Sequence, residues 1–296
     1  MTQGEKRDFA LYDLSSRRGR YVPYILISCG VLALAAGMLC VSGMQMRGAV
    51  ARPISGDALF SERRSGIRAL PRTMLWAWER PEDLNFIDPR ETGVAFLAET
   101  INIFGEGERF GVMPRRQPLR VPEGTSLVAV TRIEMRAAPA KFEEADAREI
   151  ADEIARLAVI PGIVAIQIDF DATVSQREFY GAILRQLRKQ IPNEMAISIA
   201  ALASWCFGDA WLDGLPIDEA VPMLFRMGVD DRNIRFRLAR GDDFASPVCR
   251  SSEGVSTDEV APKLSGAGIS GRRIYLFHPR SWTAAAFHEA AKGAGQ

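Results

Sequence analysis

Short apolar runs recur along the chain from residue 73 onward, and their number and spacing limit the folds that it can adopt. Helical patterns separate several of the runs. Strands that alternate with helices predict a parallel sheet, and seven or eight such units in about 220 residues fit a (β/α)8 barrel. Seven runs are clear and one is weaker: 74–78, 94–98, 127–133, 164–170, 196–202, 220–225 and 274–277, with the weaker run near 246–250.

The segments between the runs complete this α/β pattern. Residues 101–126 are rich in glycine and proline, which predicts a hairpin or long loop in place of one helix. Ser175 and Glu178 have the spacing of a capping box and predict where one helix begins. We therefore expect a somewhat irregular TIM-barrel-like domain, with an open doubly wound sheet as the alternative. Helices are expected at 142–157, 175–190, 231–240 and 283–292.

An uncharged, largely apolar segment at 22–44 precedes the predicted barrel. Its length matches the roughly 20 residues that a helix needs to cross a bilayer, and the arginines at 17–20 predict a cytoplasmic N-terminus. A signal peptide cleaved after Ala49-Val50-Ala51 is the alternative. We expect a single-pass protein of the bacterial inner membrane whose body is periplasmic or extracellular. Its parts are a cytoplasmic segment 1–21, a transmembrane anchor 22–44, a linker 45–72 and the barrel 73–296.

Charge and cysteine content narrow the function classes. The chain has 37 basic and 37 acidic residues, so no overall positive field attracts nucleic acid, and we expect no nucleic-acid partner. Cys206 and Cys249 lie in the body, where they form either a disulfide or two separate buried thiols. The cysteines and the two histidines lack metal-ligand spacing, so we expect no metal and no cofactor.

Two carboxylates stand at the end of the strand predicted at 164–170. Asp169 and Asp171 share one face of this strand, and barrel active sites gather at the C-terminal ends of the strands. Paired carboxylates suit glycoside hydrolysis, in which one carboxylic acid protonates the leaving oxygen. The alternative is a structural pair that caps a loop and binds an arginine. Glu99 and Glu134 are candidates for a second catalytic carboxylate, although Glu134 could simply pair with Arg132.

Aromatic, basic and acidic side chains follow other predicted strands. Aromatic rings at a barrel mouth suit sugar binding, with plain packing as the alternative for each tryptophan. His278 could shuttle a proton, bind substrate or have a structural role. The candidate substrate-binding residues are Trp78, Glu79, Trp205, Arg226, His278, Arg280 and Trp282.

Several long motifs resemble one bacterial family. They occupy 76–84, 167–172, 203–206, 218–228 and 276–282. This sequence resembles the domain-of-unknown-function family numbered three-one-four-two, whose name implies no established activity. More distantly, the strand around Asp169 resembles the D-x-D-x-E motif of chitinase-type glycosidase barrels. The resemblance implies barrel topology and puts Asp171 in the place of the acid, with Gln167 or Thr173 where a further acid stands in that motif.

The sequence therefore predicts a membrane-anchored extracytoplasmic barrel that acts on a cell-envelope glycan through paired carboxylates. A non-catalytic carbohydrate- or protein-binding barrel is the alternative. Whether the protein is an enzyme stays open at this point, with a glycoside hydrolase as the candidate. The expected partners are a glycan or another cell-envelope polymer and the inner membrane.

Overall fold

The computed structural model describes residues 66–105, 109–137, 142–208, 210–262 and 271–293. The expected cytoplasmic segment, the anchor and most of the linker lie outside these ranges. Among the residues inside them, none of the helices combines the length and apolar character that a membrane crossing requires.

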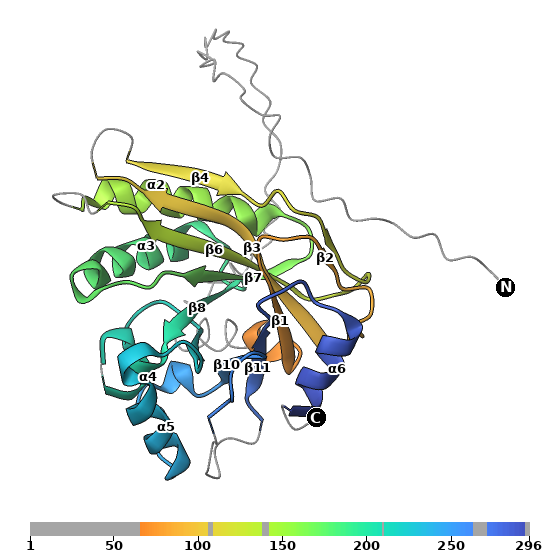
Figure 1. The fold of residues 1–296 in the computed structure, drawn as a ribbon. Coiled ribbons are helices and arrows are strands. Elements are labelled where there is room, and N and C mark those ends of the chain that lie inside the picture. The colour runs from red at the N-terminus through yellow and green to blue at the C-terminus, as the bar shows by residue number, and fades with distance from the viewer. Residues whose placement is uncertain (1–65, 106–108, 138–141, 209, 263–270, 294–296) are drawn as a thin grey trace, which may run out of the picture.

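In the part of the chain that the structure describes, eight parallel strands close into a barrel (Figure 1). β1 pairs in parallel with both β3 and β11, which closes the ring. The expected (β/α)8 architecture is therefore confirmed, and the open-sheet alternative is wrong. The strands follow the chain order around the barrel: β1 (Thr73–Ala77), β3 (Thr92–Ile103), β6 (Leu127–Met135), β7 (Ile163–Asp169), β8 (Ala196–Leu202), β9 (Glu219–Met223), β10 (Ser252–Ser256) and β11 (Arg273–Phe277).

Within the described ranges, three short strands outside the eight-stranded ring make the barrel irregular, and two of them lie in the glycine- and proline-rich segment 101–126. β3 forms an antiparallel hairpin with β4 (Phe110–Pro114), and β2 (Glu82–Asp83) pairs with β5 (Leu119–Arg120). This confirms the hairpin or long loop that the sequence predicts at 101–126.

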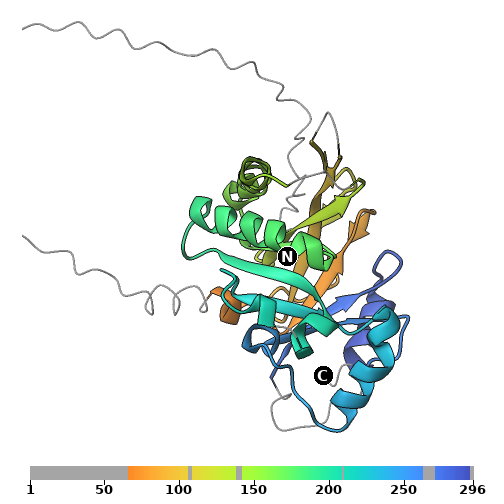
Figure 2. The same ribbon diagram turned by 90° about the vertical axis from the view of Figure 1, so that its left-hand side faces the viewer.

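Helices pack on the outside of the barrel. Figure 2 shows α2 and α3, the two green helices, lying side by side. The helices are α2 (Glu144–Ala155), α3 (Arg177–Gln190), α4 (Ala203–Gly208), α5 (Asp231–Ala239) and α6 (Ala284–Gly293). The 3-10 turns are η2 (Arg156–Val159), η3 (Val174–Gln176), η4 (Ala210–Leu212), η5 (Gly228–Asp230) and η6 (Pro247–Cys249).

Two local predictions are wrong. The weaker strand is β10, which starts at Ser252, whereas 247–249 form a 3-10 turn because Pro247 has no N–H to donate to a sheet. The capping box before α3 is Thr173 with Gln176, whose side chain accepts the Thr173 N–H at 2.8 Å. A 3-10 turn begins at Val174, so the cap lies two residues before the predicted one.

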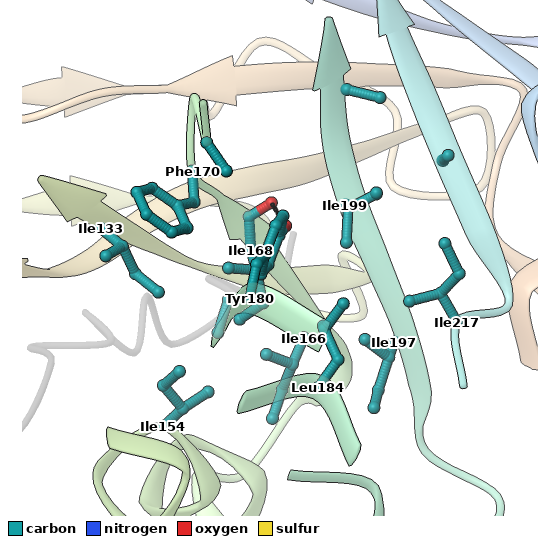
Figure 3. Packing of buried hydrophobic residues seen from close by; sticks show 14 of the residues in the cluster. Ile133, Ile154, Ile166, Ile168, Phe170, Tyr180, Leu184, Ile197, Ile199 and Ile217 are labelled. Carbon is teal, nitrogen blue, oxygen red and sulfur yellow. Dashed lines mark hydrogen bonds between the residues drawn. The ribbon is translucent and has the colours of Figure 1, made fainter. Parts of the chain in front are cut away.

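Side-chain alternation along the strands produces an outer and an inner apolar layer. Outside the barrel, Ile166 and Ile168 of β7 pack with Leu184 of α3, and Phe170 meets Tyr180 edge to face at 5.3 Å (Figure 3). The inner layer fills the barrel and includes Met74, Trp76, Val128, Val130, Ala165, Val221 and Tyr275. Ile67 and Leu70, which precede β1, belong to the same inner cluster.

A chain of hydrogen bonds runs through the barrel interior. Trp76 Nε1 donates to Gln167 Oε1 at 2.8 Å, and Gln167 Nε2 donates to Ser198 Oγ at 3.1 Å. Ser198 Oγ donates to Glu219 Oε2 at 3.1 Å, and Arg273 Nη1 donates to Glu219 Oε1 at 2.6 Å. These bonds satisfy polar groups that burial would otherwise make costly.

Cys206 and Cys249 form a disulfide that joins α4 to η6. The sequence leaves open a disulfide or two separate buried thiols, and the structure contains the disulfide. The bond ties the helix that follows β8 to the turn that precedes β10.

Candidate functional site

A cavity of ≈ 260 Å³ opens where the barrel strands end. Its walls come from the ends of β1, β6, β7, β8, β9 and β11 and from the segments that follow them. This is the end of the barrel at which enzymes of this architecture carry their active sites. The charged side chains that line the cavity are Arg132, Asp169, Asp171, Arg226 and Asp230.

Asp169 is the most perturbed of these charged groups. This residue ends β7 and is 4 % exposed, and its carboxylate accepts a hydrogen bond from Arg132 Nη1 at 2.8 Å. Burial raises the pKa of Asp169 to about 6, Arg132 opposes this rise, and the neighbouring charge of Asp171 adds to it. Asp169 therefore keeps a proton at pH values at which an ordinary aspartate has lost it.

Asp171 lines the same cavity and is exposed. Among the described residues, no hydrogen bond or ion pair holds its carboxylate. The two acids thus differ: Asp169 is buried against an arginine, and Asp171 faces the open cavity. A purely structural pair, in which one acid caps a loop and the other binds an arginine, accounts for Asp169 and leaves Asp171 without a role.

Glu134 does not line the cavity and lies in an ion-pair cluster on β6. Arg132 Nε is 2.8 Å from Glu134 Oε1, and Arg136 also pairs with this carboxylate. Arg132 therefore bridges Glu134 and Asp169. This geometry matches the alternative in which Glu134 pairs with Arg132. Glu134 therefore affects the site by holding Arg132 in place.

Glu99 lies on the outside of the barrel wall, away from the cavity. The register between β3 and β6 shifts between Leu97 and Glu99, and this irregularity changes the face to which Glu99 points. Thr131, on the outward face of β6, donates to Glu99 Oε1 at 3.0 Å. Burial raises the pKa of Glu99 to about 7. The structure does not bring Glu99 together with the aspartates.

Four aromatic rings form a wall of the cavity: Trp76, Trp78, Phe225 and Phe277. Phe225 and Phe277 stack with their planes 5° apart and their centroids at 5.5 Å. Trp76 meets Phe225 edge-on at 6.2 Å, and Trp78 meets Phe277 edge-on at 6.3 Å. Trp78 was a sequence candidate. The two phenylalanines were missed, although each directly precedes a candidate residue at a strand end.

Arg226 lies at the cavity in a left-handed backbone conformation, with φ of 52°. Its guanidinium lies over the Phe277 ring at 5.2 Å, and its backbone N–H donates to the Glu259 carboxylate at 3.2 Å. A non-glycine residue in this region is strained by about 1–2 kcal/mol. Such strain is found at functional sites, and Arg226 is a predicted binding residue that the structure does bring to the cavity.

The other two tryptophan candidates are buried and do not line the cavity. Trp205 packs edge-on against Trp211 at 4.9 Å. Trp282 donates its Nε1–H to the carbonyl of Trp76 at 3.0 Å and so supports a lining residue from behind. The packing alternative describes both, although Ser204, next to Trp205, does line the cavity.

Glu79, His278 and Arg280 also fall outside the cavity lining. Glu79 accepts the backbone N–H of Arg116 at 3.0 Å. His278 Nδ1 is in a 2.6 Å hydrogen bond with Thr257 Oγ1. Partial burial and then the charge of Arg280 lower the pKa of His278. All three follow β1 or β11 at the end of the barrel where the cavity opens.

Asp230 is a cavity residue that strand-end reasoning missed. It follows β9, after a turn, and immediately precedes helix α5. It gives the cavity a third carboxylate, on a different element from Asp169 and Asp171. Across the described ranges, no cluster of three or more histidines, cysteines, aspartates and glutamates is arranged to hold a metal ion.

Comparison with known proteins confirms the resemblance inferred from the motifs. Residues 123–223 match the family model described as Domain of unknown function (DUF3142). This span holds β6 to β9, and with them Arg132, Asp169 and Asp171. A search among curated proteins finds no match.

Among solved structures, the chain is similar to an endo-beta-N-acetylglucosaminidase from Cordyceps militaris in its apo form. The two share 9% sequence identity, and the similarity covers 75% of this chain and 86% of that chain with a TM-score of 0.42. A TM-score of this size does not indicate a shared function.

Proposed function

We propose that the barrel binds a glycan in this cavity and hydrolyses a glycosidic bond there, using Asp169 and Asp171. One observation carries the proposal: a buried aspartate whose pKa is raised to about 6 shares a cavity with an exposed aspartate and a wall of aromatic rings. Perturbed carboxyl groups in a cleft are typical of acid–base catalysis.

The two aspartates divide the chemistry between them. Asp169 donates its proton to the glycosidic oxygen, and the bond from that oxygen to the anomeric carbon breaks. The carboxylate of Asp171 stabilises the positive charge that develops on the sugar ring. Water then adds to the anomeric carbon and gives up a proton to the Asp169 carboxylate, which regenerates the acid. Arg132, held by Glu134, positions Asp169 and offsets the charge that this residue gains when the proton leaves.

The substrate class follows from the walls of the cavity. Aromatic faces present flat apolar surface to a sugar ring, while Arg226 and Asp230 offer hydrogen bonds to its hydroxyl groups. The proposed substrate is a cell-envelope glycan, because the segment 22–44 has the properties of an inner-membrane anchor. The disulfide supports a location outside the cytoplasm, where such bonds persist.

A non-catalytic glycan-binding barrel is the second candidate, and the ion pair between Arg132 and Asp169 favours it. An arginine at hydrogen-bond distance stabilises the charged form of Asp169, and the charged form cannot donate a proton. In this version the aromatic wall and Arg226 bind the sugar and no bond is broken.

A panel of cell-envelope glycans, assayed for both binding and hydrolysis, separates the two candidates. The full-length protein is compared with Asp169→Asn, Asp171→Asn and, as a control outside the cavity, Glu99→Gln. Hydrolysis that drops at least a hundredfold in both aspartate variants and persists in the control supports catalysis. Binding without hydrolysis by the unaltered protein supports the second candidate. Hydrolysis at an unchanged rate in both aspartate variants would rule out the proposed mechanism.

A further inference from the structure

A second cavity, of ≈ 360 Å³, lies at the opposite end of the barrel and is rich in arginine. The residues that line it lie just before β1, β10 and β11, or at the first position of β11. These three strands are neighbours in the barrel. Here "the arginine cavity" means the space lined by Arg68, Arg72, Arg250, Arg272 and Arg273. Five arginines around one space stand out in a chain whose basic and acidic residues balance at 37 each.

Nearby carboxylates neutralise only part of this charge. Arg272 Nη2 pairs with Asp243, and Arg273 pairs with Glu219 at 2.6 Å. Arg250 donates to backbone carbonyls, at 2.7 Å for Nε and 3.1 Å for Nη2, and no ion pair within the described ranges offsets its charge.

Two further arginines of the cavity are exposed and uncompensated. Among the described residues, no carboxylate pairs with Arg68 or Arg72. Together with Arg250, they give the cavity three positive charges that no acid in the described ranges offsets. Such a concentration of one sign of charge attracts an anion.

Arg272 lines the cavity, and two of its donor atoms lack hydrogen-bond partners among the described residues. Its side chain is 3% exposed, and its Nε and Nη1 atoms are buried without a hydrogen-bond partner among the described residues. A buried guanidinium with two unsatisfied hydrogen-bond donors lowers the stability of the fold, because water no longer solvates those donors. Glu253 also interacts electrostatically with Arg272, but burial raises the pKa of Glu253 to about 7, so this acid compensates Arg272 weakly at neutral pH.

We propose that the arginine cavity binds a phosphate group, carried either by a small solute or by a phospholipid headgroup. Guanidinium groups form paired hydrogen bonds to phosphate oxygens, and a doubly charged anion matches the uncompensated charge better than a single carboxylate does. The exposed guanidinium groups of Arg68, Arg72 and Arg250 would donate hydrogen bonds to the occupant. The site lies at the other end of the barrel from the proposed active site and does not depend on glycan hydrolysis.

The test measures the thermal unfolding of the full-length protein in neutral detergent. One arm adds inorganic phosphate, with the ionic strength held constant by sodium chloride. The other arm adds phosphatidylglycerol to the detergent micelles and compares the Tm with that in micelles carrying the same amount of phosphatidylcholine. At a ligand concentration ten times the Kd, binding should raise the Tm by about 3–6 °C. A rise with inorganic phosphate identifies a solute site, and a rise with phosphatidylglycerol alone identifies a headgroup site.

Paired variants decide whether a rise comes from this cavity. Arg68→Ala with Arg72→Ala removes two exposed charges and leaves the buried pairs intact, and this double variant should lose at least half of the rise. Arg148→Ala with Arg232→Ala removes two exposed arginines elsewhere and should keep all of it. The proposal is overturned if neither probe raises the Tm, or if the rise is the same in both double variants.

Discussion

Replacing Asp169 with asparagine should stabilise the protein at neutral pH while abolishing hydrolysis. Asparagine has nearly the shape of a protonated aspartic acid and carries no charge. The folded chain raises the pKa of Asp169 from its ordinary value of 3.8 to about 6, chiefly through burial. The charged side chain is therefore disfavoured in the folded state, even with Arg132 beside it.

The size of the effect follows from the pKa difference. A shift of roughly 2 units, at 1.36 kcal/mol per unit, corresponds to about 3 kcal/mol. Because the folded-state pKa lies above the unfolded one, the folded chain binds more protons between about pH 4 and 6. Stability contributed by protonated Asp169 is present below pH 4 and is lost as the pH rises through 6. Asp169→Asn has no such loss.

The assay is urea unfolding of the unaltered protein and Asp169→Asn at pH 4, 6 and 7.5. The variant should match the unaltered protein at pH 4 and exceed it by about 2–3 kcal/mol at pH 7.5. Glu134→Gln is the matched control, because Glu134 also binds Arg132 but is more exposed, and it should change stability by less than about 1 kcal/mol. A variant that is less stable at pH 7.5, or a difference that is constant across the pH range, would refute the reasoning.

Three further outcomes are expected. Glu99→Gln should gain about 2–3 kcal/mol of stability near pH 8, because Glu99 has a pKa of about 7 in the folded chain, and should leave glycan binding unchanged; weakened binding would contradict its place outside the cavity. Arg226→Gly should relieve about 1 kcal/mol of backbone strain and raise the Kd for glycan at least fivefold, as measured by calorimetry, and an unchanged Kd would remove Arg226 from the site. Intact-mass measurement of membrane-extracted protein should show residues 1–51 retained, whereas their loss would indicate a cleaved signal peptide.

The barrel and one side of its cavity could be predicted from the sequence because strand periodicity is a local signal. The alternation along 164–170 correctly put Asp169 and Asp171 on the inner face at a strand end. The same logic placed Trp78 and Arg226 at the cavity. In each case the side chain is within three residues of a regular strand, so the direction of the strand largely fixes its position.

Residues that follow a strand irregularity or lie well beyond a strand end could not be placed in this way. The register shift next to Leu97 turns Glu99 to the outer face, and the local sequence does not predict this shift. Trp282 folds back onto the carbonyl of Trp76, which depends on a contact between residues 206 positions apart. Asp230 reaches the cavity only through the turn that leads into α5. Long-range packing decides all three positions.

The central claim is that the cavity breaks glycosidic bonds with Asp169 and Asp171, and incubation with glycan in ¹⁸O-labelled water tests it most directly. Mass spectrometry should find one ¹⁸O atom in each new reducing end, because water adds to the anomeric carbon after the bond breaks. The unaltered protein and Glu99→Gln should produce these labelled ends at pH 5.5, below the pKa of about 6 for Asp169. Asp171→Asn should produce almost none. Labelled ends that appear equally fast with Asp171→Asn would contradict the account.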